Sequence, residues 1–286
     1  MGTPRPRADR TASMHLSGLF THPVKSLRAS AVASASVDPL GLTDDRRFMV
    51  VDESGRFLTQ RTMPRMALVA TALTPDTLTL SHESAGSIAV PRASEPHAPL
   101  RSVTVWQSEG LLAEDCGDPP ASWLSDFLRV KCRLVRIGRE FERPVLKPGK
   151  ARAGDRVNFA DGYPFLVISE ASLADLNDRL VTQGEEPVPM NRFRPNLVVS
   201  GCPAFAEDTW ARFQIGPIVF RAGGPCGRCV VTTTDQFTAE RGREPLRTLA
   251  TYRRDASDPT GVNFGQNLFH ETKSGPLRVG DAVTLL

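Results

Sequence analysis

Two cysteines separated by two residues, Cys226 and Cys229, form the motif of this sequence best suited to chemistry. Glycines surround them in GGPCGRC (223–229), and Arg228 places a cation beside Cys229. A cationic neighbour favours the thiolate form of a cysteine, and thiolates bind soft metals. Glycines allow a backbone to approach a bound ligand closely. The motif therefore predicts a site where a thiolate meets a soft metal or a large ligand.

Three other interpretations of the CxxC motif remain open. A structural zinc site needs about four ligands, whereas Cys116, Cys132 and Cys202 are isolated and the histidines show no paired spacing. A thioredoxin-like dithiol lies at the N-terminus of a helix, whereas the β-branched run 230–234 favours a strand. Two cysteines can also be buried as small apolar residues, although that leaves the surrounding glycines unexplained.

Three further motifs offer cations and hydrogen-bond donors that could hold a phosphate. They are Lys25 and Ser26 in HPVKSL (22–27), Arg46 in DDRRFMV (44–50), and Arg192, Arg194 and Asn196 in NRFRPNLVV (191–199). A guanidinium group matches a phosphate with two parallel hydrogen bonds. Taken singly, each motif is more typical of a solvated surface charge.

The sequence lacks the motifs of several common enzyme classes. In PGKAR (148–152), Ala151 stands where a P-loop needs Ser or Thr. No GxGxxG follows a predicted strand, and no GxSxG is present. The sequence therefore gives no indication of a P-loop NTPase, a Rossmann dehydrogenase or an α/β-hydrolase.

Composition narrows the class of protein further. The 286 residues are 40% hydrophobic and 23% charged, which is typical of a globular protein with one large or two medium domains. A net charge of +3 is too small to predict nucleic-acid binding. No apolar run reaches the roughly 18 residues of a membrane span. The five scattered cysteines indicate a reducing, cytoplasmic compartment rather than a disulfide framework.

The elements that must position these motifs are mainly short strands. In the first half we expect hairpins over 48–59 and 70–82, strands over 102–107 and 131–137, and a helix over 119–130. In the second half we expect strands over 164–169, 196–201, 217–222, 229–234 and 279–286, and helices over 169–180, with Ser169 as N-cap, and over 244–254. This content predicts a mainly β fold with several covering helices (α+β) and barrel-like sheets.

The domain organisation follows from a loop rich in proline, glycine and cations. FERPVLKPGKARAGD (141–155) is predicted to begin the second of two domains. We therefore expect a disordered tail over 1–13, an N-terminal domain over 14–140 and a C-terminal domain over 141–286.

Taken in order, these motifs resemble the MOSC family, with the mitochondrial amidoxime reducing components and their bacterial relatives as nearest members. The segments that carry the resemblance span about residues 14 to 286: HPVKSL, DRRFMV, FLVISEASLADLN, NRFRPNLVVSG, CGRCVVTTTD, EPLRTLATYR, NFGQN and VGDAVTLL. The resemblance implies two β-barrel-like domains, a MOSC N-terminal barrel and a MOSC domain, that enclose a molybdenum cofactor. It implies that Cys229 is the protein ligand of the metal. It also implies these cofactor contacts: Lys25, Ser26, Arg46, Asp161, Arg194, Asn196, Gly227, Arg228 and Asn267.

The function that the resemblance implies is the reduction of small N-hydroxylated compounds such as amidoximes, hydroxylamines and N-hydroxylated bases. The sequence has no cysteine after Cys229, so we expect electrons from a separate donor: a flavoprotein reductase, a ferredoxin or a cytochrome b5-like protein. Two alternatives stay open. One is a sulfur or molybdenum-cofactor carrier that uses a Cys229 persulfide or thiolate, and the other is a β-rich module without a cofactor.

Overall fold

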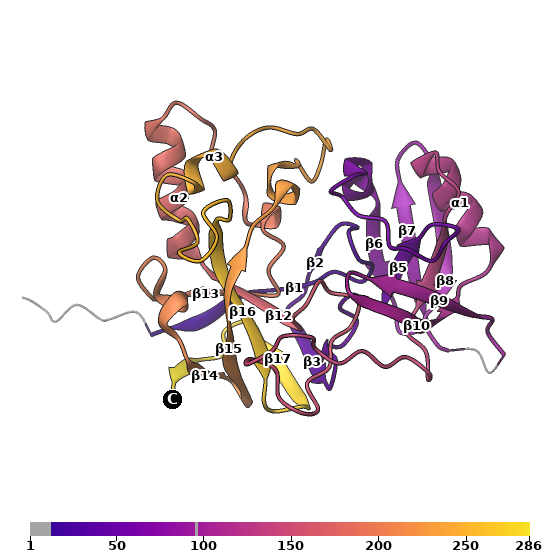
Figure 1. Ribbon diagram of the computed structural model, residues 1–286, viewed down its shortest axis with the longest axis horizontal. Helices are drawn as coiled ribbons and strands as arrows, with labels where there is room; N and C mark the ends of the chain where they lie inside the picture. Colours follow the sequence, from indigo (N-terminus) through magenta and orange to yellow (C-terminus); the bar gives the residue numbers. More distant parts are fainter. Residues whose placement is uncertain (1–12, 95–96) are drawn as a thin grey trace, which may run out of the picture.

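The structure is a computed structural model that describes residues 13–94 and 97–286. All but the last residue of the predicted disordered tail, 1–13, lies outside these ranges. The described residues form two bodies that lie side by side (Figure 1). None of the helices in these ranges has the length and hydropathy needed to cross a bilayer.

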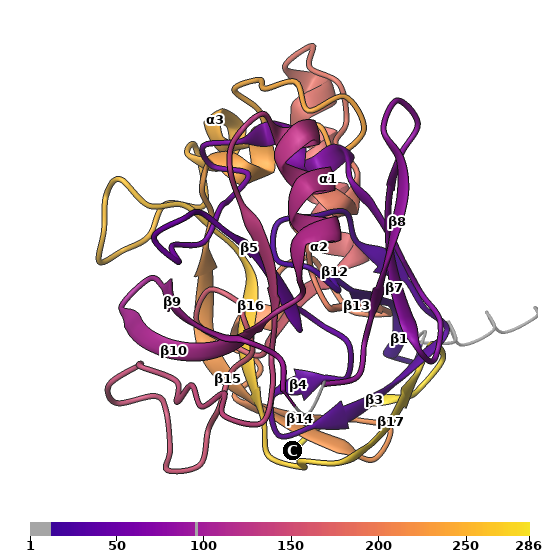
Figure 2. The same ribbon diagram turned by 90° about the vertical axis from the view of Figure 1, so that its right-hand side faces the viewer.

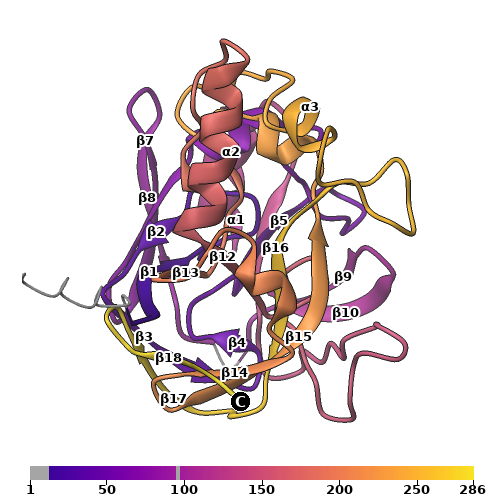
Figure 3. The same cartoon turned by 90° about the vertical axis from the view of Figure 1, so that its left-hand side faces the viewer.

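The first body contains most of the second half of the chain, built on one eight-stranded sheet (Figure 3). In spatial order its strands are β18 (Val283–Leu285), β14 (Arg212–Ile215), β15 (Ile218–Gly227), β16 (Asn263–His270), β12 (Phe165–Ser169), β13 (Leu197–Ser200), β1 (His15–Thr21) and β2 (Ser30–Ala31). Only β12 and β13 pair in parallel. One face covers a core that includes Phe165, Phe213 and Phe220, all buried. The strands therefore bring the start of the chain next to its second half.

A small sheet closes the same body. It has three strands in the order β17 (Gly275–Arg278), β3 (Ser34–Asp38) and β4 (Gly41–Leu42). Residues from both ends of the chain thus pair within one body, through β1 with β13 and through β3 with β17. The predicted domain boundary at 140/141 stays a prediction.

The second body contains the rest of the first half (Figure 2). One sheet has the order β5 (Phe48–Val51), β11 (Arg133–Arg136), β10 (Ser108–Asp115) and β9 (Leu100–Val105), and the other has β6 (Ala70–Leu73), β7 (Thr77–His82) and β8 (Gly86–Pro91). Helix α1 (Asp118–Leu128) covers this body and buries Leu124 and Phe127 against it. The predicted mainly β fold with few helices is confirmed, and the curled sheets agree with two barrel-like units.

The other helices are short or lie on the first body. They are α2 (Glu170–Thr182), α3 (Leu246–Leu249) and the 3-10 turns η1 (Pro64–Leu68), η2 (Met190–Arg192), η3 (Ala206–Thr209) and η4 (Val230–Thr233). The side chain of Ser169 accepts a hydrogen bond from the backbone N–H of Ser172, so the predicted N-cap is confirmed. The N-cap fixes the point at which β12 passes into α2.

Three of the predicted elements are wrong or shortened. The strand expected over 279–286 is limited to β18, Val283–Leu285. Residues 229–234 do not form a strand; Val230–Thr233 form η4, because the hydroxyls of Thr232 and Thr233 donate to the carbonyls of Cys229 and Val230 at 3.0 and 2.9 Å. The helix expected over 244–254 is limited to α3, since the chain is already extended at Arg254, which bridges to Val262. Local hydroxyl bonding and strand pairing thus override the sequence pattern in the last two places.

Candidate functional site

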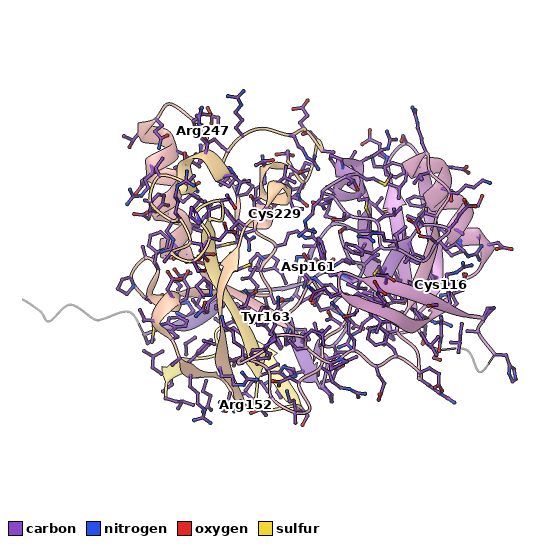
Figure 4. The ribbon with its side chains drawn as sticks, viewed as in Figure 1. Cys116, Arg152, Asp161, Tyr163, Cys229 and Arg247 are labelled. Atoms are coloured by element: carbon purple, nitrogen blue, oxygen red, sulfur yellow. The ribbon has the colours of Figure 1, made fainter. Side chains whose placement is uncertain are left out.

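A cavity lies where the two bodies meet, and the ten site residues that the family resemblance implied all line it. They are Lys25, Ser26, Arg46, Asp161, Arg194, Asn196, Gly227, Arg228, Cys229 and Asn267. Figure 4 shows Asp161 and Cys229 near the middle of the molecule, between the two bodies. Residues from distant parts of the chain therefore converge on one space.

The CxxC motif lies at the distorted end of a strand. Strand β15 slips in register against β16 between Ala222 and Gly224 and again between Pro225 and Gly227. A Cβ added to Gly223 would lie 2.5 Å from the Tyr163 ring, so only glycine fits there. At Gly227, by contrast, the nearest atom to an added Cβ is 3.9 Å away. The backbone beside the thiols is therefore open to a ligand.

Each thiol lies beside a guanidinium group. Arg228 Nη1 donates to Cys226 Sγ at 2.9 Å. Burial alone would lower the pKa of Arg61, but Asp161 and Cys229 outweigh it and raise that pKa above its ordinary value. Both cysteines of the CxxC motif thus lie next to an arginine.

A buried lysine and a carboxylate connect the two bodies. Lys25 Nζ contacts Asp161 Oδ1 and donates to the carbonyl of Phe159 at 2.8 Å. Arg61 donates to the other carboxylate oxygen of Asp161 at 2.8 Å. Burial lowers the pKa of Lys25 to about 8, although Asp161 opposes the shift. Burial alone would raise the pKa of Asp161, but Lys25 and Arg61 hold it well below its usual range.

A second carboxylate, Asp45, does not line the cavity but binds Arg46, which does. Asp45 accepts from Arg46 Nη1 at 2.6 Å and lies 3.3 Å from His22 Nδ1. Burial, with Arg46 and Arg194 nearby, lowers the pKa of His22 to about 3, so the imidazole is neutral. Ser26, Arg46 and Arg194 all have positive φ angles, of 66°, 47° and 56°. Non-glycine residues seldom adopt this conformation, and it is concentrated at functional sites.

Two arginines face the cavity without a carboxylate partner among the described residues. Arg194 has one weak contact, 3.4 Å to the Gln236 amide oxygen, and its Nη2 is buried and unpartnered. Arg228 bonds Cys226 and the carbonyl of Phe193, and its Nε is buried and unpartnered. Burial and the charge of Arg46 lower the pKa of Arg194 to about 9. An unpaired buried donor has a free-energy cost that an anionic ligand in the cavity would offset.

Sequence reasoning missed several residues of this cavity. Arg61 and Thr59 come from the loop 52–63, and Tyr163 follows Asp161. Arg61 lies 100 residues from Asp161 in the chain, and TQRTMPR (59–65) carries no motif. Only the three-dimensional contact reveals it.

Comparison with known proteins identifies the family of this chain. Residues 13–131 match the MOSC N-terminal beta barrel domain, and residues 154–284 match the MOSC domain. The chain belongs to the MOSC family. Mitochondrial amidoxime-reducing component 1 of Mus musculus is 38% identical over 281 residues, covering 94% of this chain and 81% of the relative. The human protein of the same name is 35% identical, covering 94% and 82%.

A second kind of MOSC protein is also similar. Molybdenum cofactor sulfurase of Danio rerio is 33% identical over 278 residues, covering 91% of this chain and 32% of that protein. This chain is therefore similar to amidoxime-reducing components along nearly its whole length, and to one part of a larger sulfurase.

The cavity of this MOSC protein fits the molybdenum cofactor that the family implies. Unpartnered N–H groups of Arg194 and Arg228 offer donors to a phosphate, and the Cys229 thiol offers the sulfur that a soft metal prefers. The open backbone at Gly227 leaves space beside that thiol. Within residues 13–94 and 97–286, no three His, Cys, Asp or Glu side chains are grouped to hold a metal by themselves.

Proposed function

We propose that this protein is a molybdenum-cofactor-dependent reductase of small N-hydroxylated compounds: amidoximes, hydroxylamines and N-hydroxylated bases. The observation that carries the proposal is the convergence of Cys229 with two half-buried arginines, each with a buried and unpartnered nitrogen, on one cavity between the two bodies. The names of the mouse and human relatives support amidoxime reduction. In the overall reaction two electrons and two protons cleave the N–O bond, and the oxygen leaves as water.

The cationic side chains would anchor the cofactor. Lys25, Arg194 and Arg228 offer donors to its phosphate and pterin, and Asn196 and Asn267 offer amides. Arg46, Ser26 and Gly227 complete the wall. The bound cofactor would supply the two-electron chemistry. A stable cationic cradle around it would set its position relative to the substrate.

Cys229 would bind the metal as a thiolate. Arg61 neutralises part of that charge and is held in turn by Asp161. Asp161 also binds the Lys25 ammonium. The same carboxylate would therefore orient two cations, Arg61 toward the Cys229 thiol and Lys25 toward the cofactor. The Nζ atom of Lys25 carries its proton at neutral pH, because its pKa is about 8.

Electrons would come from a separate donor protein. A flavoprotein reductase, a ferredoxin or a cytochrome b5-like protein would each serve. Cys132, Cys202, Cys226 and Cys229 are free thiols, which supports a reducing, cytoplasmic compartment for the reaction.

Metal content and turnover test the proposal together. We expect wild-type protein from a cofactor-producing host to contain near one molybdenum per chain and to reduce benzamidoxime with a reduced dye. Cys229→Ala should lose the metal and the activity. Cys226→Ala is the matched control and should keep the metal. A folded, metal-free wild-type protein, or full turnover by Cys229→Ala, would contradict the assignment.

A carrier of sulfur or of the cofactor is the second candidate. The similarity to a molybdenum cofactor sulfurase favours it. In that case Cys229 would carry a persulfide, visible in a mass spectrum as one added sulfur atom on the peptide that contains it. Reductase turnover without this adduct would favour the enzyme.

A further inference from the structure

A second, larger cavity adjoins the cavity that Cys229 lines, which is called the cofactor cavity from here on. It encloses about 540 Å³, compared with about 160 Å³ for the first. The two share a wall that includes Asp161, Tyr163, Cys226 and Gly227. A molecule bound in the larger cavity would therefore have one end next to the cofactor cavity. Its other end would remain outside the cofactor cavity.

Planar and apolar groups form much of the larger cavity. Trp106 and Tyr163 supply rings, and Leu146 and Pro144 supply aliphatic surface. Trp106 is 40% exposed and Leu146 is 50% exposed. Arg61 lies 4.7 Å from the centroid of the Trp106 ring, and the remaining apolar surface in a cavity is typical of a ligand site. A flat ring fits against these walls better than a flexible polar chain.

Three cationic side chains line the larger cavity, and two of them already bind neighbouring groups of the protein. Arg143 donates to Ser108 Oγ and to the carbonyls of Asn158, Ala160 and Asp161. Arg61 is paired with Asp161. Their positive charges are thus used to hold the wall together.

Lys147 is the third cation, and it is available. Its Nζ lies 5.5 Å from the centroid of the Tyr163 ring, and no carboxylate of the described residues pairs with it. A Cβ on Gly162 would lie 2.9 Å from Lys147 Cε, so the side chain folds over the shared wall because residue 162 is glycine. The loop is anchored, since Lys150 N and Ala151 N donate to the Lys147 carbonyl and Arg221 donates to the Lys150 carbonyl.

We propose that the larger cavity binds the non-reacting end of the substrate and selects planar N-hydroxylated compounds that carry an anionic group, which Lys147 binds. This inference rests on the proposed reductase function. A carboxylate and a phosphate offer the same chemistry to an ammonium group. The ring lies along Tyr163 and Trp106, the N–O group points to the cofactor cavity, and the anion reaches Lys147.

Matched pairs of substrates test this selection. Benzamidoxime and 4-carboxybenzamidoxime differ by one carboxylate, and N-hydroxycytidine and its 5′-monophosphate differ by one phosphate. We expect kcat/KM to favour the anionic member of at least one pair, and the pair that shows it identifies the anion. In Lys147→Gln the anionic-to-neutral ratio should fall about fivefold, as expected for one partly exposed ion pair. High salt should lower the same ratio in the wild type.

A neighbouring lysine supplies the control. Lys150 lies on the same loop, but its ammonium rests against Gly224, outside the residues that line the larger cavity. Lys150→Gln makes the same change in net charge and should alter the ratio less than about twofold. An equal fall in both variants, or an unchanged ratio in Lys147→Gln, would overturn the assignment of Lys147.

Binding without turnover separates this inference from the proposed function. Calorimetry of 4-carboxybenzamidoxime with the purified protein, without reductant, should give a dissociation constant that weakens about fivefold in Lys147→Gln. If this holds while no probe is reduced, the reductase function fails but the anion subsite stands. If the probes are reduced with no preference for an anion and no change in binding, the subsite fails and the function stands.

Discussion

Arginine side chains meet opposite conditions in two regions of this molecule. In the second body, Arg136 on β11 is 3% exposed and donates to Glu114 on β10 at 2.8 Å. Its Nη1 donates to the carbonyl of Pro91 at 2.9 Å. In the cavity between the bodies, Arg194 and Arg228 have unpartnered nitrogens and no carboxylate among the described residues.

The difference separates a structural role from a binding role. A buried charge with a hydrogen-bonded partner contributes to folding only as part of its pair, because removing one partner leaves the other charge buried alone. A buried charge without a partner has a free-energy cost in the unliganded protein that an anionic ligand would offset. The unpartnered arginine nitrogens of the cofactor cavity therefore lower the stability of the unliganded protein. Arg136 on β11 has no such effect, because Glu114 on β10 is its partner.

The largest effect that the comparison predicts is on folding, in the second body. Arg136→Met should lower the free energy of unfolding by about 3–5 kcal/mol, because Glu114 would keep a buried charge. Urea denaturation of the cofactor-free protein measures it. The double variant Arg136→Met with Glu114→Leu should recover most of the loss. Equal losses in the single and double variants would show that packing, not charge, is responsible.

The corresponding change in the cavity should leave folding intact. Arg194→Met removes a cation whose pKa burial already lowers to about 9, so the free energy of unfolding should stay the same or rise by about 1 kcal/mol. Loss of molybdenum from the purified protein should become about a hundredfold faster, because a buried charge-assisted contact to the cofactor is missing. Metal analysis over time after removal of free cofactor measures this rate.

An exposed arginine gives the control for this variant. Arg179 on α2 pairs with Asp175, and its side chain is 46% exposed. Arg179→Met makes the same substitution far from the cavity walls and should retain molybdenum like the wild type. If Arg194→Met destabilised the protein by several kcal/mol while keeping its metal, the two classes of buried arginine would not differ as argued.

The sequence predicted the parts of this site that rest on local signals. Helix α2 begins at its predicted N-cap, Ser169, because a hydroxyl next to free backbone N–H groups determines that point without distant contacts. The CxxC motif and the cationic motifs are short, so their residues could be named from the chain alone. Their convergence on one cavity followed from the family resemblance and not from spacing.

The remaining parts depend on contacts between distant residues. Val230–Thr233 has the composition of a strand, yet threonine hydroxyls bond back to the preceding carbonyls and form a 3-10 turn. Arg61 joins the site through an ion pair across 100 residues, and the pairing of β1 with β13 spans more of the chain still. Hydrophobic patterns along a chain report periodicity and do not encode such long-range pairs.

The smallest predicted effect is a response to pH that has opposite signs with and without the cofactor. Burial lowers the pKa of Lys25 from 10.5 to about 8. Without the cofactor, the unfolded chain binds more protons at this residue than the folded protein between pH 8 and 10.5. The contribution of Lys25 to the free energy of unfolding should therefore rise with pH in this window, by at most about 1.4 kcal/mol for each pH unit.

With the cofactor bound, the same proton is needed to pair with its anionic groups. Release of molybdenum should therefore become faster as the pH rises above about 8, by up to tenfold per unit. Lys25→Arg, which stays charged, should flatten both trends. Asp161→Asn removes the carboxylate that raises the pKa of Lys25 and should move the onset of release to lower pH. If the release of molybdenum did not become faster above pH 8 while the free energy of unfolding of the cofactor-free protein still rose, Lys25 would make no contact with the cofactor.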